Sequence, residues 1–295
     1  MNSKFGKVLI TGASGQLAQA LMHSAPAGTE CVGLSRAELD IADEAGVQAA
    51  ITSLQPDCVI NGAAYNLVDK AEGAGMEAAL RINALGVARL AKACRDADIP
   101  LVHFSTDFVF DGEKRTPYTE ADATHPLSVY GASKLAGENI ALAASPLHFA
   151  IRVCRLFGPI VGETTGSLQK PAGNFPLLML RLGQERESLK IVSDQIGSPS
   201  YTPDLARGIW QLITRGEGGL YQLSNAGEVS FDEYARAVFK LAGINCRVES
   251  VTTQEYGAPA HRPLYSTLNN AKAHATGVTA LRHWHDALTE FVQQL

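Results

Sequence analysis

The stretch KVLITGASGQLAQALMH, residues 7–23, decides the fold of this chain. Its apolar start has the length of a buried strand, residues 12–15 supply a glycine-containing turn, and residues 16–23 have the composition of a helix. The same alternation continues through the first half of the chain. It predicts further strands at 30–34, 57–61, 101–105 and 149–154, and further helices at 43–54, 76–97 and 129–144. This spacing is typical of parallel βαβ units in an α/β fold with one doubly wound sheet of the Rossmann type.

The second half of the chain is less regular. Glycine and proline cluster at 158–173 and again at 197–203. Helices are predicted at 174–183, 204–214, 231–241 and 281–293. This pattern favours a smaller C-terminal α/β lobe. We expect a dinucleotide-binding domain over residues 1–155, re-entered by about residues 192–215, and a mainly substrate-binding lobe over residues 156–295.

The overall composition excludes several classes of protein. The chain has 295 residues, 46% of them hydrophobic and 19% charged, and its formal net charge is −5. A disordered chain has a weaker apolar content, and a nucleic-acid-binding protein usually carries a large basic surface. No apolar run approaches the roughly 18 residues that cross a bilayer, and the N-terminus lacks the apolar core of a signal peptide. We therefore expect a cytoplasmic protein with no nucleic-acid partner and no membrane partner.

The cysteines predict neither a disulfide framework nor a metal site. They are scattered along the chain without a C-x-x-C pair, and their number is odd. We expect reduced thiols in the core at Cys31, Cys58, Cys94, Cys154 and Cys246.

The turn after the first strand predicts a phosphate-binding site. Gly12 and Gly15 allow a sharp turn and a close approach of the backbone to a pyrophosphate, and Gln16 and Leu17 open the following helix. A helix N-terminus offers unpaired amides and the positive end of the helix dipole to an anion. Glycines also make ordinary strand-to-helix turns, but the strand before and the helix after favour a dinucleotide cofactor.

The end of the second expected strand bears on the choice of cofactor. Ser35 offers a hydroxyl and Arg36 a cation, where an enzyme specific for NAD typically has a carboxylate for the ribose hydroxyls. This pair suits a 2′-phosphate, so NADPH is favoured and NADH is the alternative. Arg36 can also be explained as a solvated surface charge. Asp40 and Ile41 fit either a place beside the adenine or the start of the next helix.

A catalytic group is predicted at Tyr130 and Lys134. The two residues are spaced i and i+4, so on a helix their side chains lie on one face. A nearby ammonium favours the phenolate, and we expect it to lower the tyrosine pKa toward the neutral range. Ser105 and Thr106 end the fourth expected strand, at the edge where ligands bind in such sheets. Either hydroxyl can donate to a substrate carbonyl oxygen.

Several segments carry a resemblance to a known family. They are residues 61–65 (NGAAY), 68–72 (VDKAE), 105–112 (STDFVFDG), 130–138 (YGASKLAGE), 194–199 (DQIGSP) and 262–266 (RPLYS). With these motifs the chain resembles the extended short-chain dehydrogenase/reductases and, among them, the dTDP-4-dehydrorhamnose reductase family. The matching segments run nearly from end to end, and STDFVFDG and DQIGSP are fairly specific to that group.

The resemblance implies roles for particular residues. It makes Tyr130 the proton donor and Lys134 a ligand of the nicotinamide ribose, with Thr106 and Ser105 holding the substrate oxygen. It places three residues along the middle of the cofactor, namely Ala63, Ala64 and Tyr65. It places three more near the nucleotide-linked substrate, namely Val68, Asn174 and Arg262. Some members of the family form dimers, so a homodimer is left open.

The function implied is NADPH-dependent reduction of the C4 ketone of a nucleotide-linked 4-keto-6-deoxysugar. One alternative is a sugar-nucleotide epimerase or dehydratase of the same superfamily, although dehydratases commonly have a glutamate where this chain has Phe108. Another is a non-catalytic subunit that resembles the regulatory β subunit of methionine adenosyltransferase. Where the family usually has a tryptophan after the fifth strand, this chain has Arg155, a candidate substrate contact that leaves the identity of the sugar open.

Overall fold

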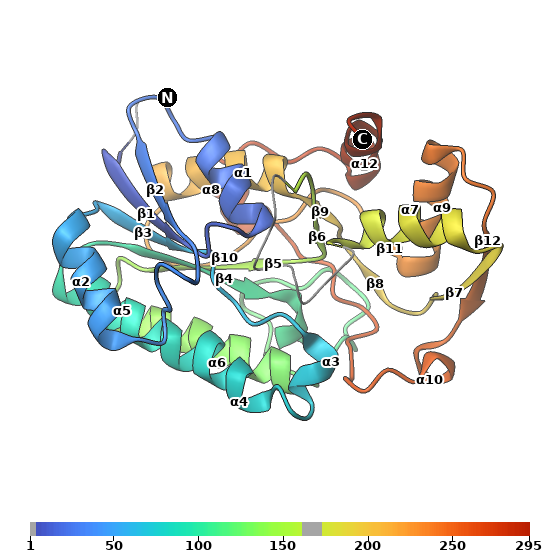
Figure 1. Ribbon diagram of the computed structural model, residues 1–295, viewed down its shortest axis with the longest axis horizontal. Coiled ribbons are helices and arrows are strands. Elements are labelled where there is room, and N and C mark those ends of the chain that lie inside the picture. Colours follow the sequence, from blue (N-terminus) through green and yellow to red (C-terminus); the bar gives the residue numbers. More distant parts are fainter. Residues whose placement is uncertain (1–3, 161–172) are drawn as a thin grey trace.

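A six-stranded sheet forms the centre of the computed structural model, which describes residues 4–160 and 173–295 (Figure 1). All neighbouring strands are parallel, as the sequence predicted. From one edge to the other the strands are β10 (Gly219–Gln222), β5 (Phe149–Val153), β4 (Leu101–Thr106), β3 (Cys58–Asn61), β1 (Lys7–Thr11) and β2 (Glu30–Leu34). The strand order reverses beside β1, where the chain leaves β2 and crosses to β3. A crevice at such a reversal is where doubly wound sheets bind their ligands.

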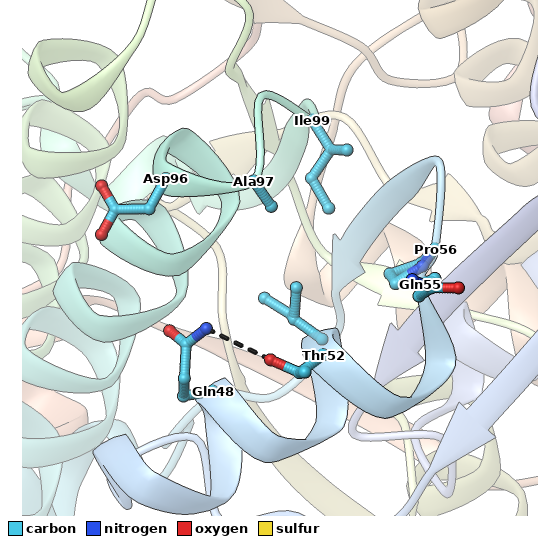
Figure 2. Close-up of a pocket in the computed structure, with 8 residues that line it drawn as sticks. Gln48, Thr52, Gln55, Pro56, Asp96, Ala97 and Ile99 are labelled. Carbon is cyan, nitrogen blue, oxygen red and sulfur yellow. Dashed lines mark hydrogen bonds between the residues drawn. The ribbon is translucent and has the colours of Figure 1, made fainter.

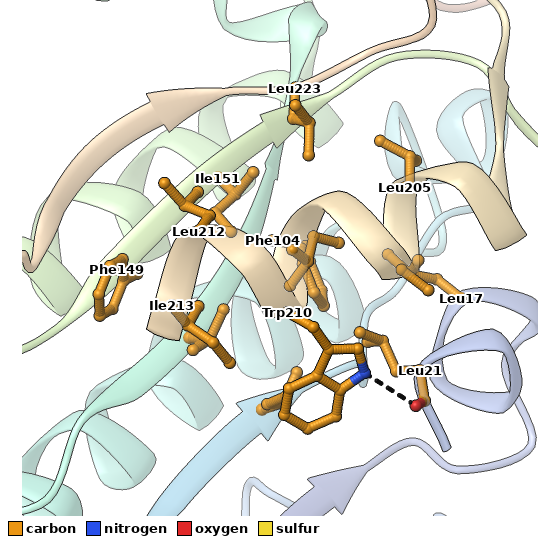
Figure 3. Packing of buried hydrophobic residues seen from close by; sticks show 14 of the residues in the cluster. Leu17, Leu21, Phe104, Phe149, Ile151, Leu205, Trp210, Leu212, Ile213 and Leu223 are labelled. Carbon is orange, nitrogen blue, oxygen red and sulfur yellow. Dashed lines mark hydrogen bonds between the residues drawn. The ribbon is translucent and has the colours of Figure 1, made fainter. Parts of the chain in front are cut away.

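Helices cover both faces of the sheet (Figure 1). On one face lie α1 (Gln16–His23) and α8 (Thr202–Arg215), and on the other α2 (Glu44–Leu54), α5 (Val87–Asp96) and α6 (Val129–Ala144). Figure 3 shows the core between the first pair of helices and the sheet, where the Trp210 indole donates a hydrogen bond of 3.0 Å to the Leu21 carbonyl. Strands covered on both faces are apolar throughout, which explains the continuous apolar runs in the sequence.

One predicted helix differs from the structure. The region expected to be a single helix over 76–97 consists of α4 (Met76–Leu80), a π-helical stretch (Arg81–Gly86) and α5. The wide turns bring Asn83 into the core, where its amide accepts from Tyr65 N and donates to Tyr65 O, both at 2.9 Å. This tertiary pairing stabilises a wide turn that residue spacing does not predict.

The C-terminal lobe packs beside the carboxyl end of the sheet (Figure 1). Its core lies between α7 (Phe175–Glu185), α9 (Phe231–Ala242), α12 (Trp284–Gln293) and a parallel pair of strands, β7 (Ser188–Val192) and β12 (Arg247–Val251). The remaining short elements are α3 (Val68–Ala71), β6 (Leu156–Phe157), β8 (Ile196–Gly197), β9 (Ser200–Tyr201), β11 (Val229–Ser230), α10 (Thr253–Tyr256) and α11 (Ala271–Ala275).

After α7 and β7 the chain leaves the C-terminal lobe and contributes α8 and β10 to the sheet region. Helix α8 packs against α1, and β10, which the sequence analysis did not identify, pairs with β5 from Gly219 to Gln222. Within residues 4–160 and 173–295, no helix combines the length and the apolar character needed to cross a membrane.

Candidate active site

The glycine turn is built for a close approach of the backbone. Gly12 has a φ of 63°, in the region that favours glycine, and a Cβ on it would lie 2.6 Å from the amide nitrogen of Ala63. The Gly15 amide donates to the Gly12 carbonyl at 2.8 Å and closes the turn. Gly15 is also the N-cap of α1, and without a side chain it cannot cap the first amides of that helix itself. The turn therefore fits a phosphate group.

Gln16 and Asn174, which were predicted on cofactor and substrate, lie together in the structure. The Asn174 amide donates to Gln16 Oε1 at 3.3 Å and to the Gly158 carbonyl at 2.9 Å, and Gln16 Nε2 donates to the Leu156 carbonyl at 3.3 Å. These bonds join α1 to the start of α7 in the C-terminal lobe. Leu17 is only 6% exposed and packs in the core, so it has only its backbone to offer a ligand.

The residues after β2 form a compact polar turn. Glu38 accepts from the Ser35 amide at 2.8 Å, and Arg36 is exposed. Asp40 accepts from Arg81 at 2.5 Å, and its pKa is lowered despite partial burial because Ala42 N and the Arg81 guanidinium bind it. Ile41 is buried in the core, and its place beside the adenine stays a prediction. The Ser35 side chain also hydrogen-bonds Glu38, and the contact of Ser35 and Arg36 with a 2′-phosphate stays a prediction.

The loop after β3 is fixed from two sides. The Asn61 side chain accepts from Thr11 Oγ1 at 2.7 Å and from Ala63 N at 3.1 Å. Asn83 holds the backbone of Tyr65 and also donates to Ser133 Oγ on α6 at 3.0 Å. The loop formed by Ala63, Ala64 and Tyr65 is thus held by hydrogen bonds beside the glycine turn. It lies next to α6, the helix that carries Tyr130 and Lys134.

Thr106 and Tyr130 meet at the carboxyl end of β4. Their hydroxyl groups share a hydrogen bond, and the partly buried Tyr130 ring stands edge-on to the Phe108 ring at a centroid distance of 5.8 Å. Ser105 is 2% exposed, and its hydroxyl has no hydrogen-bond partner among the described residues. Successive side chains of a strand point to opposite faces, so only Thr106 is brought to Tyr130.

Lys134 lies one turn along α6 from Tyr130 and is 3% exposed. Its ammonium donates to the carbonyl of Phe104 in β4. Burial lowers the pKa of Lys134 to about 8, and the carboxylate of Glu138 acts against this shift. Glu138 itself is bound by Arg152 in a buried pair, with Arg152 Nε 2.9 Å from Glu138 Oε2.

The pKa of Tyr130 shifts in the direction opposite to the one expected from Lys134. Burial raises it to about 12, the hydrogen bond with Thr106 lowers it, and the Asp107 carboxylate raises it. The expectation was wrong because the Lys134 ammonium is turned to the Phe104 carbonyl and burial prevails. A neutral tyrosine at pH 7 is suited to give a proton rather than to take one.

Arg155 does not extend freely into the site. Its guanidinium donates to the carbonyls of Val229 at 2.8 Å and Gln195 at 3.0 Å, and it lies 3.9 Å from the centre of the Phe231 ring. A Cβ on Gly197 would lie 2.9 Å from Arg155 Nε, so the DQIGSP segment needs its glycine to admit this arginine. The residue ties β5 to the C-terminal lobe, and its proposed contact with substrate stays a prediction.

Arg262 pairs with Asp69 on α3. Its guanidinium donates to Asp69 Oδ2 at 2.8 Å and to the Ala260 carbonyl at 3.0 Å, and it is 18% exposed. Asp69 follows Val68, the first residue of α3, and also accepts from Ala260 N at 3.3 Å. The pair connects α3 to the segment that follows α10.

Three residues at the site were not predicted to have a role. They are Asn83, Asp107 and Glu72, whose carboxylate accepts from Val129 N at the start of α6 at 2.8 Å. A buried asparagine inside an alanine-rich helical stretch was a usable signal for Asn83, because asparagine is a weak helix former. Asp107 and Glu72 gave no local signal, since their partners lie far away in the sequence.

Other parts of the chain offer less chemistry. A pocket of about 320 Å³ lies between α2 and α5, lined by residues such as Gln48, Thr52 and Asp96 (Figure 2). It opens at the ends of the helices that lead into β3 and β4, the edge of the sheet opposite Thr106. Within residues 4–160 and 173–295, no group of three or more His, Cys, Asp or Glu side chains is placed to hold a metal ion.

Comparison with known proteins identifies the family. The family model described as "RmlD substrate binding domain" matches residues 6–295. A dTDP-4-keto-6-deoxy-D-glucose reductase of Streptomyces niveus is 38% identical over 96% of this chain and 95% of its own length. A dTDP-4-dehydrorhamnose reductase of Mycolicibacterium smegmatis is 37% identical over 97% of this chain and 85% of its own length.

A solved structure agrees over the whole fold. The crystal structure of dTDP-4-dehydrorhamnose reductase from Bacillus anthracis, in complex with NADP, superposes with a TM-score of 0.91 at 34% identity and covers 98% of this chain and 99% of that one. The resemblance inferred from the sequence motifs is confirmed, and the chain belongs to the RmlD substrate binding domain family.

Proposed function

We propose that this protein reduces the C4 ketone of a nucleotide-linked 4-keto-6-deoxysugar with NADPH. The observation that carries the proposal is the contact of the Thr106 and Tyr130 hydroxyl groups, with Lys134 one helical turn away, at the carboxyl end of the sheet. The reductase relatives and the NADP-bound neighbour supply the class of substrate and the cofactor. Residues 1–155 with the returning segment would bind the cofactor, and the C-terminal lobe would bind the substrate.

The residues at the glycine turn fit a dinucleotide. The absence of a Cβ at Gly12 leaves a cradle against Ala63, and the N-terminus of α1 faces the same turn. Gly12, Gly15 and Gln16 would hold the diphosphate, and Ser35 with Arg36 the 2′-phosphate. When bound, NADPH supplies the hydride that adds to the ketone carbon.

The side chains at β4 and α6 then provide for the developing alkoxide. Tyr130, neutral at pH 7, gives its proton to the oxygen at C4, while Thr106 donates a hydrogen bond to the same oxygen. Lys134, whose ammonium donates to the Phe104 carbonyl one helical turn from Tyr130, would bind the ribose hydroxyls of the cofactor. The ring of Phe108 packs on Tyr130 where a dehydratase has an acid, so no carboxyl at this position removes water.

A substrate diphosphate is an anion, and the guanidinium of Arg262 is a cation that would bind it. Its planar guanidinium matches phosphate oxygens in a bidentate fashion. Asn174, which is 7% exposed, and Val68, which is partly buried, stay predicted substrate contacts. The homodimer and the cytoplasmic location stay predictions.

The proposal is tested with the purified protein, NADPH and a panel of nucleotide-linked sugars. We expect NADPH oxidation with 4-keto-6-deoxy sugars and none with nucleotide-linked sugars that lack the ketone. Conversion of a nucleotide hexose without net NADPH consumption would identify an epimerase or dehydratase instead. Binding of NADPH without turnover of any sugar in the panel would favour a regulatory subunit.

A further inference from the structure

Asp107 is a buried carboxyl group beside the catalytic hydroxyls that the proposed mechanism does not use. It directly follows Thr106, begins the 3-10 turn Asp107–Val109 and is 2% exposed. Within residues 4–160 and 173–295, no lysine or arginine forms an ion pair with it. Burying a carboxyl group without a cationic partner costs free energy, and hydrogen bonds to the group reduce that cost.

Three donors bind Asp107, and they divide unequally between its two oxygens. Ser266 Oγ and Cys154 Sγ both donate to Oδ2, at 2.6 Å and 3.1 Å. Thr106 Oγ1 donates to Oδ1 at 3.1 Å. Because Oδ2 already accepts two protons in hydrogen bonds, a proton added to the carboxylate belongs on Oδ1, the oxygen that faces Thr106.

Thr106 has a single proton and more than one oxygen to give it to. Its Oγ1 accepts from Phe108 N at 3.2 Å, and its hydroxyl is in contact with both Asp107 Oδ1 and Tyr130. As long as Asp107 is ionised, it attracts that proton most strongly. Thr106 then has no proton left to donate to a substrate oxygen.

We propose that Asp107 is a positioning residue that sets the direction of the Thr106 hydroxyl. As a neutral acid its Oδ1–H donates to Thr106 Oγ1, and the Thr106 proton is free to bind the oxygen at C4. The proton on Oδ1 comes from water and stays there through turnover, since Tyr130 gives the proton that the alkoxide takes. The inference rests on the proposed reductase function and adds a second requirement to it, a neutral Asp107.

The surroundings of Asp107 act on the pKa of its carboxyl group in two directions. Burial raises the pKa of its carboxyl group, although its three hydrogen bonds and the charge of Arg155 act in the opposite direction. The other titratable groups that face it are Cys154 at the end of β5 and Tyr130 on α6. Burial raises the pKa of Cys154 well above its usual value and that of Tyr130 to about 12, so both stay protonated donors at pH 7.

The test compares Asp107→Asn with Asp107→Ala. An asparagine can place its carbonyl oxygen toward Ser266 and Cys154 and its amide toward Thr106, so it reproduces the donor of the neutral acid. We expect Asp107→Asn to retain kcat within about tenfold of the wild type, and Asp107→Ala to lose about a hundredfold or more with KM for the sugar nearly unchanged. Thermal unfolding checks that each variant is folded.

The pH profile separates orientation of Thr106 from a merely structural role. The wild type should lose kcat as Asp107 ionises with rising pH, and Asp107→Asn should lack that limb. Asp111→Asn, a matched change in the same STDFVFDG segment, should keep the wild-type profile. If Asp107→Asn is as inactive as Asp107→Ala, or if its profile matches the wild type, the inference is overturned. A wild type that reduces no 4-keto sugar instead overturns the proposed function and this inference with it.

Discussion

The carboxylate of Asp69 and the guanidinium of Arg262 form an ion pair of 2.8 Å between residues that are 193 positions apart in the chain. It joins α3, which follows the loop after β3, to the C-terminal lobe. A diphosphate that enters between the two lobes would bring a second anion to the same arginine. Asp69 therefore competes with the substrate for Arg262 in the proposed site.

If a diphosphate replaces the Asp69 carboxylate on Arg262, substitutions of Arg262 and Asp69 should change dTDP affinity in opposite directions. Arg262→Gln should weaken the binding of dTDP by about tenfold or more, because a bidentate charged contact is lost. Asp69→Asn should strengthen it by up to about fivefold at low salt, since a partly exposed ion pair contributes at most about 1 kcal/mol. Isothermal titration at two salt concentrations measures both. Glu77→Gln, a matched change on α4, should leave the affinity as it is. Weaker binding by Asp69→Asn would mean that Asp69 positions Arg262 without competing.

Lys134 is expected to lower the stability of the fold while it supports catalysis. Its pKa falls from 10.5 to about 8, so below pH 8 the buried charge opposes folding at full strength, and the penalty shrinks as pH rises from 8 to 10.5. Lys134→Met should raise the free energy of unfolding at pH 7 by about 1 to 3 kcal/mol and reduce kcat about a hundredfold or more. Urea unfolding and turnover measure the two effects. Lys240→Met, on the exposed face of α9, should change neither, and a less stable Lys134→Met would refute the assignment.

Replacing Arg155 is expected to lower the free energy of unfolding and not to act directly on the reaction. Arg155→Met removes the donors to the carbonyls of Val229 and Gln195 and the stacking on Phe231. We expect the free energy of unfolding to fall by about 2 to 4 kcal/mol, because two carbonyls lose their partners. Arg186→Met, an exposed change at the end of α7, should stay within about 0.5 kcal/mol of the wild type. Unchanged stability with a large rise in KM would show instead that Arg155 binds the sugar.

Arg36 is expected to make the protein prefer NADPH over NADH. It is exposed after β2, and Arg36→Ala should weaken NADPH binding by about tenfold or more while NADH binding changes less than about twofold. Fluorescence titration of each cofactor measures the two constants. Arg95→Ala on the exposed side of α5 serves as the control. An equal loss for NADPH and NADH would remove Arg36 from the 2′-phosphate site.

Much of the fold could be predicted because the strongest signals are local. The bounds of β1, α1, β2 and α6 match the expected ranges, since each is a short apolar run or a periodic stretch with a clear turn or cap at its end. Strand β10 was missed because Gly219–Gln222 is short and its burial comes from pairing with β5. The π-helical turns were missed because Asn83 is held by the distant backbone of Tyr65.

The site was predicted only in part for the same reason. Tyr130 and Lys134 share a helix, and Thr106 ends a strand, so their positions follow from sequence spacing. Two of the three partners of Asp107 come from positions 47 and 159 residues away, and no sequence pattern connects them to it. The pKa of Tyr130 was predicted in the wrong direction because spacing gives the distance between two side chains and cannot give the direction of the Lys134 ammonium.

The role of Tyr130 as the group that protonates the reduced C4 oxygen can be measured with a single substitution. Turnover of a dTDP-linked 4-keto-6-deoxy sugar with NADPH is compared between the wild type and Tyr130→Phe, with NADPH affinity measured in both. We expect kcat to fall by about a hundredfold or more, with NADPH binding within about threefold of the wild type. Turnover by Tyr130→Phe at a rate close to that of the wild type would contradict it.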